Sequence, residues 1–224
     1  MQYPVGSVVR ALFISRPNRF IAHCKLGEET VVCHVKNTGR CRELLVSGAV
    51  VYLCRAAEGS ARKTAFDLIA VEKGGRLINM DSYAPNLAAG EFLRHRYDAV
   101  RAEVKYGNSR VDFLAEKDGV KTFVEVKGVT LERDGAVFFP DAPTERGAKH
   151  LRELMRAVEE GYRAAVLFVI QMEDVRYFSP NDETDPAFGK ALREAAEAGV
   201  DIWAYCCRVT EETMEITDAV EVRL

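Results

Sequence analysis

The chain of 224 residues lacks several features that mark common classes of protein. No apolar run approaches the ~20 residues of a membrane-spanning helix, and the first residues have neither the basic start nor the apolar stretch of a signal peptide. The six cysteines include no C-x-x-C pair and no zinc-ribbon spacing. We therefore expect a cytoplasmic protein with no membrane partner, in which Cys24, Cys33 and Cys54 are reduced core residues.

The charge of the chain is unevenly distributed. Residues 1–80 carry 12 Lys or Arg and 6 Asp or Glu, a net charge of +6, whereas residues 81–224 carry 19 and 28, a net charge of −9. A basic segment joined to an acidic one indicates a part that binds polyanions beside a part that carries carboxylates. The alternative is that charge simply varies along the chain.

The first part of the chain, residues 1–81, has the pattern of a small β-barrel domain. Short runs of β-branched and apolar residues alternate with turn residues, and residues 39–45 have the pattern of one or two helical turns. The strands are expected at 6–15, 19–26, 30–35, 49–55, 64–72 and 76–80. Five strands with a helix between the third and fourth form the plan of an OB-fold, a barrel that often binds nucleic acid.

The second part, residues 82–224, changes to a pattern of helices and strands. A helix capped by Asn86 is followed by a three-strand meander over 100–131, a helix capped by Thr144, a buried strand at 164–170 and a helix capped by Asp185. A polar loop is expected at 171–185 and two last strands at 200–206 and 214–222. This order predicts a mixed sheet flanked by helices, of the α/β or α+β class.

Asp112 and the pair Glu125-x-Lys127 are the candidate catalytic residues. They lie in two strand-like runs separated by Asp118-Gly119, the preferred pair for a two-residue hairpin turn. Paired residue numbers in such a hairpin have a constant sum, here 237, so Asp112 and Glu125 should oppose each other with Cβ atoms roughly 5 Å apart. Lys127 is two residues further and should project from the same face as Glu125.

Further carboxylates extend this patch. If the Gly107-Asn108 turn also has two residues, Glu103 opposes Asp112 from the other side, and Glu91 could supply another ligand. Opposed carboxylates repel each other, and oxygen-rich sites suit Mg²⁺ or Mn²⁺. The alternative is a solvated charged face in which Lys127 and Arg110 neutralise the acids.

Basic and polar side chains that could contact nucleic acid occur in both parts. One group lies in the expected barrel loops, and a second lies near the start of the helix capped by Thr144, where backbone N–H groups also favour phosphate. Phe20 is expected in the barrel core, with base stacking as the alternative. The candidate nucleic-acid-binding residues are Arg16, Arg19, Lys36, Asn37, Arg40, Arg146, Lys149 and Arg152.

The second part resembles the core of PD-(D/E)xK nucleases, with Asp112 followed by Glu125-x-Lys127 on successive strands. Five motifs span the chain: Asn18-Arg19-Phe20, residues 34–40, residues 106–113, residues 125–131 and the long run from Phe139 to Leu151. With these motifs the whole chain resembles the sugar fermentation stimulation protein A family, although Lys36 stands where that family usually has proline.

The resemblance implies an N-terminal OB-like domain, a nuclease-like C-terminal domain and DNA binding, with RNA as a further possible partner and a homodimer as a possible assembly. Two functions are compatible with it. The first is a Mg²⁺- or Mn²⁺-dependent nuclease, and the second is a non-catalytic DNA-binding regulator of sugar (maltose) metabolism, which the family's name favours. The complete Asp112, Glu125 and Lys127 set favours the nuclease, because a protein that only binds DNA gains nothing from opposed carboxylates near phosphates.

Overall fold

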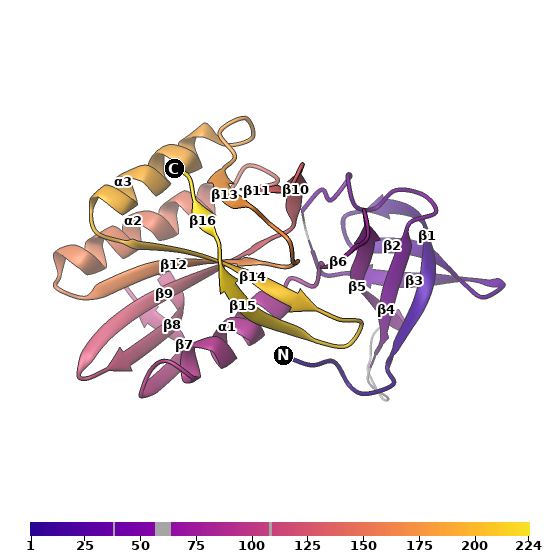
Figure 1. Cartoon of the computed structure of the whole chain (residues 1–224), viewed down its shortest axis with the longest axis horizontal. Helices are drawn as coiled ribbons and strands as arrows, with labels where there is room; N and C mark the ends of the chain where they lie inside the picture. Colours follow the sequence, from indigo (N-terminus) through magenta and orange to yellow (C-terminus); the bar gives the residue numbers. More distant parts are fainter. Residues whose placement is uncertain (38, 57–63, 108) are drawn as a thin grey trace.

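The alternation of short strands with three amphipathic helices produces a mixed α/β chain with two lobes (Figure 1). The computed structural model describes residues 1–37, 39–56, 64–107 and 109–224. An N-terminal barrel forms one lobe, and a larger sheet covered by helices on both faces forms the other. No helix in these described ranges is both long enough and apolar enough to cross a membrane.

The first lobe is the expected OB-like barrel. Its strands follow one another in the order β3-β2-β1-β4-β5-β6, and a parallel pairing of β3 with β5 closes five of them into a barrel. Cys24, Cys33 and Cys54 are buried free thiols, as expected. The strands are β1 (Val8–Asn18), β2 (Ile21–Leu26), β3 (Glu29–Val35), β4 (Val50–Arg55), β5 (Phe66–Lys73) and β6 (Arg76–Asn79).

The one or two helical turns expected at 39–45 are present as a single turn, in which Leu45 N donates to Cys41 O at 3.0 Å. The guanidinium of Arg16 donates to the carbonyls of Gly39 and Arg40 at 2.9 and 3.0 Å.

The second lobe is built on a six-stranded sheet with the order β15-β14-β12-β9-β8-β7. Strands β7, β8 and β9 form the predicted antiparallel meander, and β12 and β14 continue the sheet in parallel with β9. The strands are β7 (Ala99–Tyr106), β8 (Ser109–Lys117), β9 (Val120–Val129), β12 (Arg163–Ile170), β14 (Asp201–Val209) and β15 (Met214–Ala219).

A small second sheet was not predicted from the sequence. Its strands β10 (Leu131–Arg133), β11 (Ala136–Phe139), β13 (Tyr177–Pro180) and β16 (Glu221–Val222) pair in the order β10-β11-β13-β16. These strands have two to four residues each, too few for a period-two pattern to be recognised. The predicted loop at 171–185 therefore contains a strand, and the predicted last strand is divided into β15 and β16.

Helices α2 (Glu145–Glu159) and α3 (Pro186–Glu197) have the predicted caps, because the side chains of Thr144 and Asp185 accept the N–H groups three residues later. Helix α1 (Ala84–Arg94) begins two residues before the expected Asn86 cap. Pro85 lies in its first turn, where the missing N–H costs no hydrogen bond. Asn86 therefore lies inside the helix and does not cap it, so its side chain can form a hydrogen bond elsewhere.

A buried polar network joins the two lobes. Lys36 Nζ contacts Asp81 Oδ2 at 2.8 Å and Asp67 Oδ2 at 3.1 Å. Gln171, at the end of β12, donates to Asn79 Oδ1 at 3.1 Å, and Asn79 N donates to Gln171 O at 3.0 Å. Since unpaired buried polar groups are costly, these contacts hold the barrel in a defined position beside the second sheet.

The backbone at Gly128 is packed tightly against the side chains of Gln171 and Pro85 at the joint between the lobes. A Cβ atom at Gly128 would lie 2.6 Å from Gln171 Oε1 and 2.7 Å from Pro85 Cγ. We predict that Gly128→Ala lowers the free energy of unfolding by about 1–3 kcal/mol, as overpacking does elsewhere. Urea unfolding followed by circular dichroism measures this change.

Gly90→Ala is the matched control, because its Cβ would lie 3.4 Å from the Phe113 ring, an ordinary contact, inside helix α1. That variant should be neutral or stabilised, since alanine favours helix more than glycine does. Equal stability of Gly128→Ala and the wild type would show that the joint is not tightly packed.

Candidate functional site

The hairpin of β8 and β9 brings Asp112 and Glu125 close enough for their charges to interact. The observed pairs, from Lys117–Val120 to Phe113–Val124, all follow the predicted constant sum. Beyond the last of these pairs, the Val126 N–H donates to a side chain and not to the backbone of β8. Its acceptor is Asp112 Oδ2, at 2.7 Å. The side chain of Asp112 thus reaches across to the strand that carries Glu125.

Glu125 is a buried charge with cationic and hydrogen-bonding partners. Its side chain lies in β9 at 3% exposure. Its Oε1 accepts from Lys127 Nζ at 2.6 Å and is hydrogen-bonded to His150 Nδ1. Burial alone would raise the pKa of Glu125, but the hydrogen bond from His150 and the charge of Lys127 outweigh it, so this pKa lies below its ordinary value. Glu125 is therefore ionised at neutral pH.

The pKa of Asp112 is shifted in the opposite direction, above its ordinary value. Burial and then the charge of Glu125 raise its pKa, against the hydrogen bond from Val126 and the charge of Lys127. Its Oδ1 also accepts from Asn86 Nδ2 at 2.9 Å, which is the bond that the early start of α1 makes possible. Two carboxylates with pKa values displaced in opposite directions are typical of functional sites.

His150 is the main feature of the site that the sequence reasoning did not find. The structure places the ring of this buried residue, which is 8% exposed, against Glu125. Its Nε2 accepts from Arg146 Nε at 3.3 Å. The signal in the sequence was the position of His150 beside the buried stripe of Leu151 and Leu154, which points it towards the sheet.

The two carboxylates predicted as further metal ligands, on Glu103 and Glu91, have partners outside the group formed by Asp112, Glu125 and Lys127. The neighbours of Glu103 follow the predicted register, with Ala102 paired to Phe113 and Val104 to Val111, but Glu103 itself has a φ of 55° and interrupts the ladder. Its exposed side chain contacts Arg110 at 3.4 Å. Glu91 forms an ion pair of 2.5 Å with the amino group of Met1. Among the described residues, no group of three or more His, Cys, Asp or Glu side chains is arranged to hold a metal ion.

Two of the predicted nucleic-acid contacts, Lys36 and Arg16, also have structural roles. The Lys36 ammonium is 14% exposed and occupied by Asp67 and Asp81, so it belongs to the joint between the lobes. The Nη atoms of Arg16 donate to four backbone carbonyls, two of which belong to Arg19 and Asn37, at 2.7 Å each. Lys36 and Arg16 are both half-buried and bound within the protein, and their contact with nucleic acid stays a prediction.

The remaining barrel residues border an open groove of about 700 Å³. Arg19, Arg40 and Arg42 are exposed along it, and Arg16 forms part of its wall. Phe20, expected in the core, is 50% exposed, and the Arg19 guanidinium lies 5.8 Å from its ring centre. The groove thus has the cations and the neighbouring aromatic ring that a nucleic-acid surface requires.

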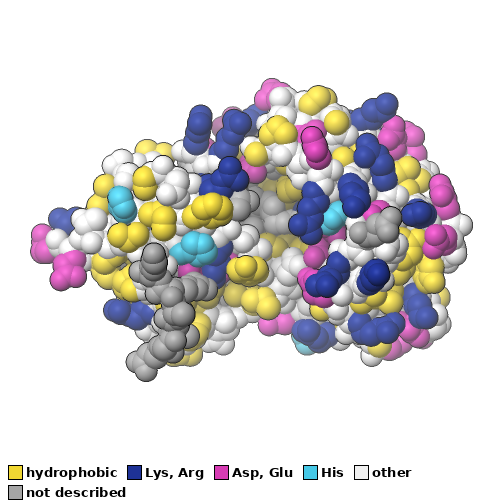
Figure 2. Space-filling view, turned by 180° about the vertical axis from the view of Figure 1, so that it is seen from behind, with side chains coloured by type: hydrophobic (Ala, Val, Ile, Leu, Met, Phe, Trp, Pro, Cys, Tyr) yellow, Lys and Arg dark blue, Asp and Glu magenta, His cyan; other side chains and the backbone are white. Residues whose placement is uncertain are grey.

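Loop residue Asn37 of the barrel lies near the end of strand β9. It lines a small cavity together with Gly128, the residue after Lys127, and with Asp141. On helix α2, Arg146, Lys149 and Arg152 are exposed, and Lys149 lies 3.9 Å from Glu153. Lys and Arg side chains lie on both sides of the hollow between the lobes (Figure 2).

Two family models match the chain and together cover most of it. The model described as "SfsA N-terminal OB domain" matches residues 14–80, and the model described as "Sugar fermentation stimulation protein RE domain" matches residues 81–213. The chain belongs to the sugar fermentation stimulation protein family. The resemblance inferred from the sequence motifs is therefore confirmed, and the second family model includes the strands that carry Asp112, Glu125 and Lys127.

Relatives in this family are similar over nearly their whole length. The chain is 54% identical over 216 residues to the sugar fermentation stimulation protein homolog of Desulfitobacterium hafniense strain Y51, covering 95% of this chain and 94% of that protein. It is 51% identical over 223 residues to the homolog of Ruminiclostridium cellulolyticum, covering 97% and 98%. The structure of Pyrococcus furiosus SfsA in complex with Ca²⁺ matches with a TM-score of 0.88 and 27% identity over both complete chains.

The repulsion between Asp112 and Glu125 has a measurable consequence. We predict that Asp112→Asn raises the free energy of unfolding by up to about 1 kcal/mol at neutral pH in the presence of EDTA. Because the pKa of Asp112 is raised by folding, its charged form destabilises the native state above that pKa. The difference in the free energy of unfolding between variant and wild type should shrink as the pH falls through the pKa of Asp112. Unfolding curves at several pH values measure this difference.

Asp134→Asn is the control, because Asp134 is an exposed turn residue whose φ of 50° asparagine also tolerates. It should unfold as the wild type does. A loss of stability in Asp112→Asn at neutral pH would contradict the electrostatic account of the site.

Proposed function

We propose that this protein is a nucleic-acid-binding phosphodiesterase that depends on a divalent cation. The observation that carries the proposal is the pair of opposed carboxylates, Asp112 and Glu125, with Lys127 on the same strand face as Glu125. Hydrolysis of a phosphodiester requires an activated water and positive charge near the phosphate, and these residues can hold or supply both.

The donor set fits Mg²⁺ or Mn²⁺. Lys127 and His150 both bind Oε1 of Glu125, and no described residue is hydrogen-bonded to Oε2. This oxygen and the Asp112 carboxylate would hold the cation, whose remaining positions would take water and phosphate oxygens, as Mg²⁺ prefers. When bound, the cation would lower the pKa of a bound water and neutralise developing negative charge. The Ca²⁺ complex of the Pyrococcus furiosus relative supports a divalent cation in this family.

Lys127 and His150 would have different roles. The Lys127 ammonium is 15% exposed, so it can reach a phosphate while remaining beside Glu125. We assign it to orienting the attacking water and stabilising the phosphate. His150 is a positioning residue, because it holds Glu125 Oε1 and is itself fixed by Arg146. Arg146 is exposed at this point and can contact a phosphate of the bound strand.

The nucleic acid would run from the barrel groove towards the carboxylates. The groove presents Arg19, Arg40 and Arg42. Asn37, in the loop beside the groove, lines a small cavity together with Gly128, which follows Lys127 in the chain. The cations on both sides of the hollow between the lobes fit a polyanion lying across it (Figure 2). DNA is the partner that we propose, with RNA tested beside it.

A binding protein without catalysis is the second candidate function. The barrel groove and its exposed cations would bind DNA whether or not the carboxylates act, and the relatives' printed name refers to a sugar-fermentation phenotype. The two functions differ in what Lys127 does, because a lysine beside a cation site matters little for binding and greatly for hydrolysis.

We predict that Lys127→Ala abolishes Mg²⁺- or Mn²⁺-dependent cleavage while Mn²⁺ binding is nearly unchanged, because lysine is not a metal ligand. Asp112→Asn should lose both. Calorimetry with Mn²⁺ and cleavage assays on single-stranded, duplex and branched DNA and on RNA measure the two properties.

Lys190→Ala is a suitable control for Lys127→Ala, because it removes an exposed cation from helix α3 without touching Glu125 or the expected nucleic-acid surface. The nuclease proposal fails if the wild type binds Mn²⁺ and DNA but cleaves none of these substrates. It also fails if Lys127→Ala cleaves as fast as the wild type.

We also predict that DNA binding falls steeply with salt, because phosphate contacts release counterions. Substituting Arg19 and Arg40 with alanine should flatten the plot of log K against log salt by about one unit per lost contact. Arg10→Ala with Lys25→Ala is the control pair, since both residues are exposed on the same barrel but do not line the groove. An equal change in both pairs would exclude the groove as the binding surface.

A further inference from the structure

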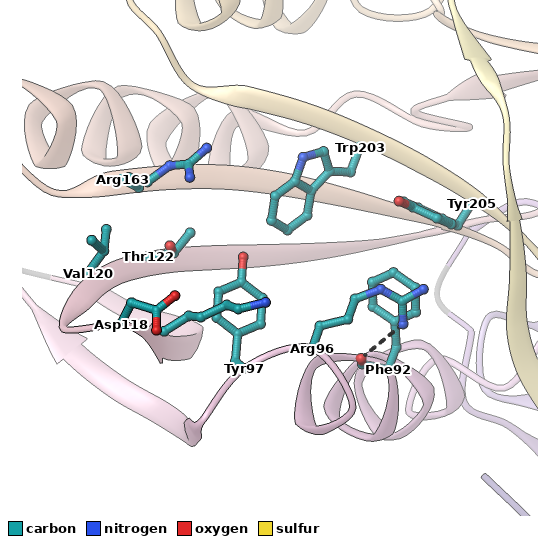
Figure 3. Close-up of a pocket in the computed structure, with 10 residues that line it drawn as sticks. Phe92, Arg96, Tyr97, Asp118, Val120, Thr122, Arg163, Trp203 and Tyr205 are labelled. Carbon is teal, nitrogen blue, oxygen red and sulfur yellow. Dashed lines mark hydrogen bonds between the residues drawn. The ribbon is translucent and has the colours of Figure 1, made fainter.

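A second concave site lies in the larger lobe, away from the carboxylates. It is a pocket of about 420 Å³ bordered by the end of α1, the hairpin turn of β8 and β9, and strand β14 (Figure 3). Thr122 lies at its base, on the same face of β9 as Val124 and Val126, which pack against α1. Glu125 projects from the opposite face, towards His150. The pocket and the carboxylate site are therefore on different faces of one sheet.

The pocket exists because α1 is too short for the face it covers. The helix has 11 residues and a length of about 16 Å, whereas the ten residues of β9 extend over about 33 Å. The sheet beyond Arg94 is bordered instead by the segment that follows α1 and by side chains of β14. Sequence patterning alone did not indicate this gap.

Aromatic rings form the walls. Trp203 and Tyr205 project from β14, and Tyr97 stands opposite them after the end of α1 (Figure 3). The Phe92 ring packs against Tyr205 with centroids 4.8 Å apart, and the Arg96 guanidinium lies 3.6 Å from the Phe92 centroid. Rings held in this way offer flat faces on which a planar ligand can stack.

Hydrogen-bonding groups in the same walls have no partner in the protein. Among the described residues, none is hydrogen-bonded to the hydroxyls of Tyr97, Tyr205 and Thr122 or to the indole N–H of Trp203. The Asp118 carboxylate is the one acid that lines the pocket in the described part of the chain. These groups suit a flat ring that carries both donors and acceptors.

Two cations stand at the rim on the side of the hairpin turn. Lys117 is exposed and forms no ion pair with a described residue, and Arg163 is 64% exposed beside Asp201 at 3.2 Å. A group that stacks on the rings would place an attached anion within the reach of these side chains. Lysine and arginine are the usual partners of phosphate.

We propose that this pocket binds a nucleotide, with its base stacked on Trp203 and Tyr97 and its phosphate held by Lys117 and Arg163. The Asp118 carboxylate would accept a hydrogen bond from an exocyclic amino group, so AMP should bind more tightly than UMP. The nucleotide could be free or could belong to an unpaired strand. The pocket does not depend on hydrolysis at Asp112 and Glu125.

Trp203 makes a direct test possible, because it is the single tryptophan of the chain. Its fluorescence is followed during titration with AMP, UMP, adenosine, inorganic phosphate and a short single-stranded oligoadenylate. We expect saturable quenching by AMP and weaker binding of adenosine, which lacks the phosphate. Quenching by the oligonucleotide but not by AMP would identify a strand as the source of the nucleotide and would support the pocket equally.

The double variant Lys117→Gln and Arg163→Gln should weaken AMP binding about tenfold or more, as the loss of charge-assisted hydrogen bonds does. Tyr97→Leu should weaken it at least about fivefold through lost stacking. The control, Lys190→Gln with Arg208→Gln, removes two cations that are 78% and 62% exposed and do not line the pocket. Urea unfolding of each variant checks that the fold is retained.

The proposal is overturned if no nucleotide or oligonucleotide alters Trp203 fluorescence at low salt. It is also overturned if the pocket variants bind AMP as the control does, or if the fluorescence changes only with protein concentration, which indicates self-association. Mn²⁺ binding at Asp112 and Glu125 is measured on the same samples, so failure of the nucleotide pocket is distinguished from failure of the proposed cation site.

Discussion

The close approach of two carboxylates, on Asp112 and Glu125, is the constraint on which the rest of the site depends. A buried charge must be compensated by a partner or by a proton. Helix α2 supplies His150 and strand β9 supplies Lys127, which together keep Glu125 ionised. Burial and the repulsion from Glu125 together raise the pKa of Asp112. The site is thus arranged so that a divalent cation would remove a cost that the folded chain already carries.

The same principle explains how the two lobes are joined. Lys36 lies between the acids of Asp67 and Asp81, and Gln171 links the end of β12 to the last barrel strand. Because these contacts are buried, breaking one partner would leave an unpaired group. A fixed joint places the barrel groove and the carboxylates in a constant relation, which a nucleic acid lying across both lobes would need.

Local patterns predicted much of this architecture. The Asp118-Gly119 turn fixed the register of β8 and β9, because hairpin pairing follows from turn length. The contact of His150 with Glu125 could not be predicted, since it joins residues 25 positions apart through helix packing. Glu103 shows the limit of register arguments, because a positive φ turned its side chain away from the expected row. Lys36 shows the limit of charge counting, which cannot separate a buried cation from a surface one.

Crystals soaked in Mn²⁺ and measured at an anomalous wavelength test the central claim most directly. The account predicts one anomalous peak between the carboxylates of Asp112 and Glu125, within metal–ligand distance of both. The absence of a peak at this position, in crystals that bind Mn²⁺ elsewhere, would contradict it.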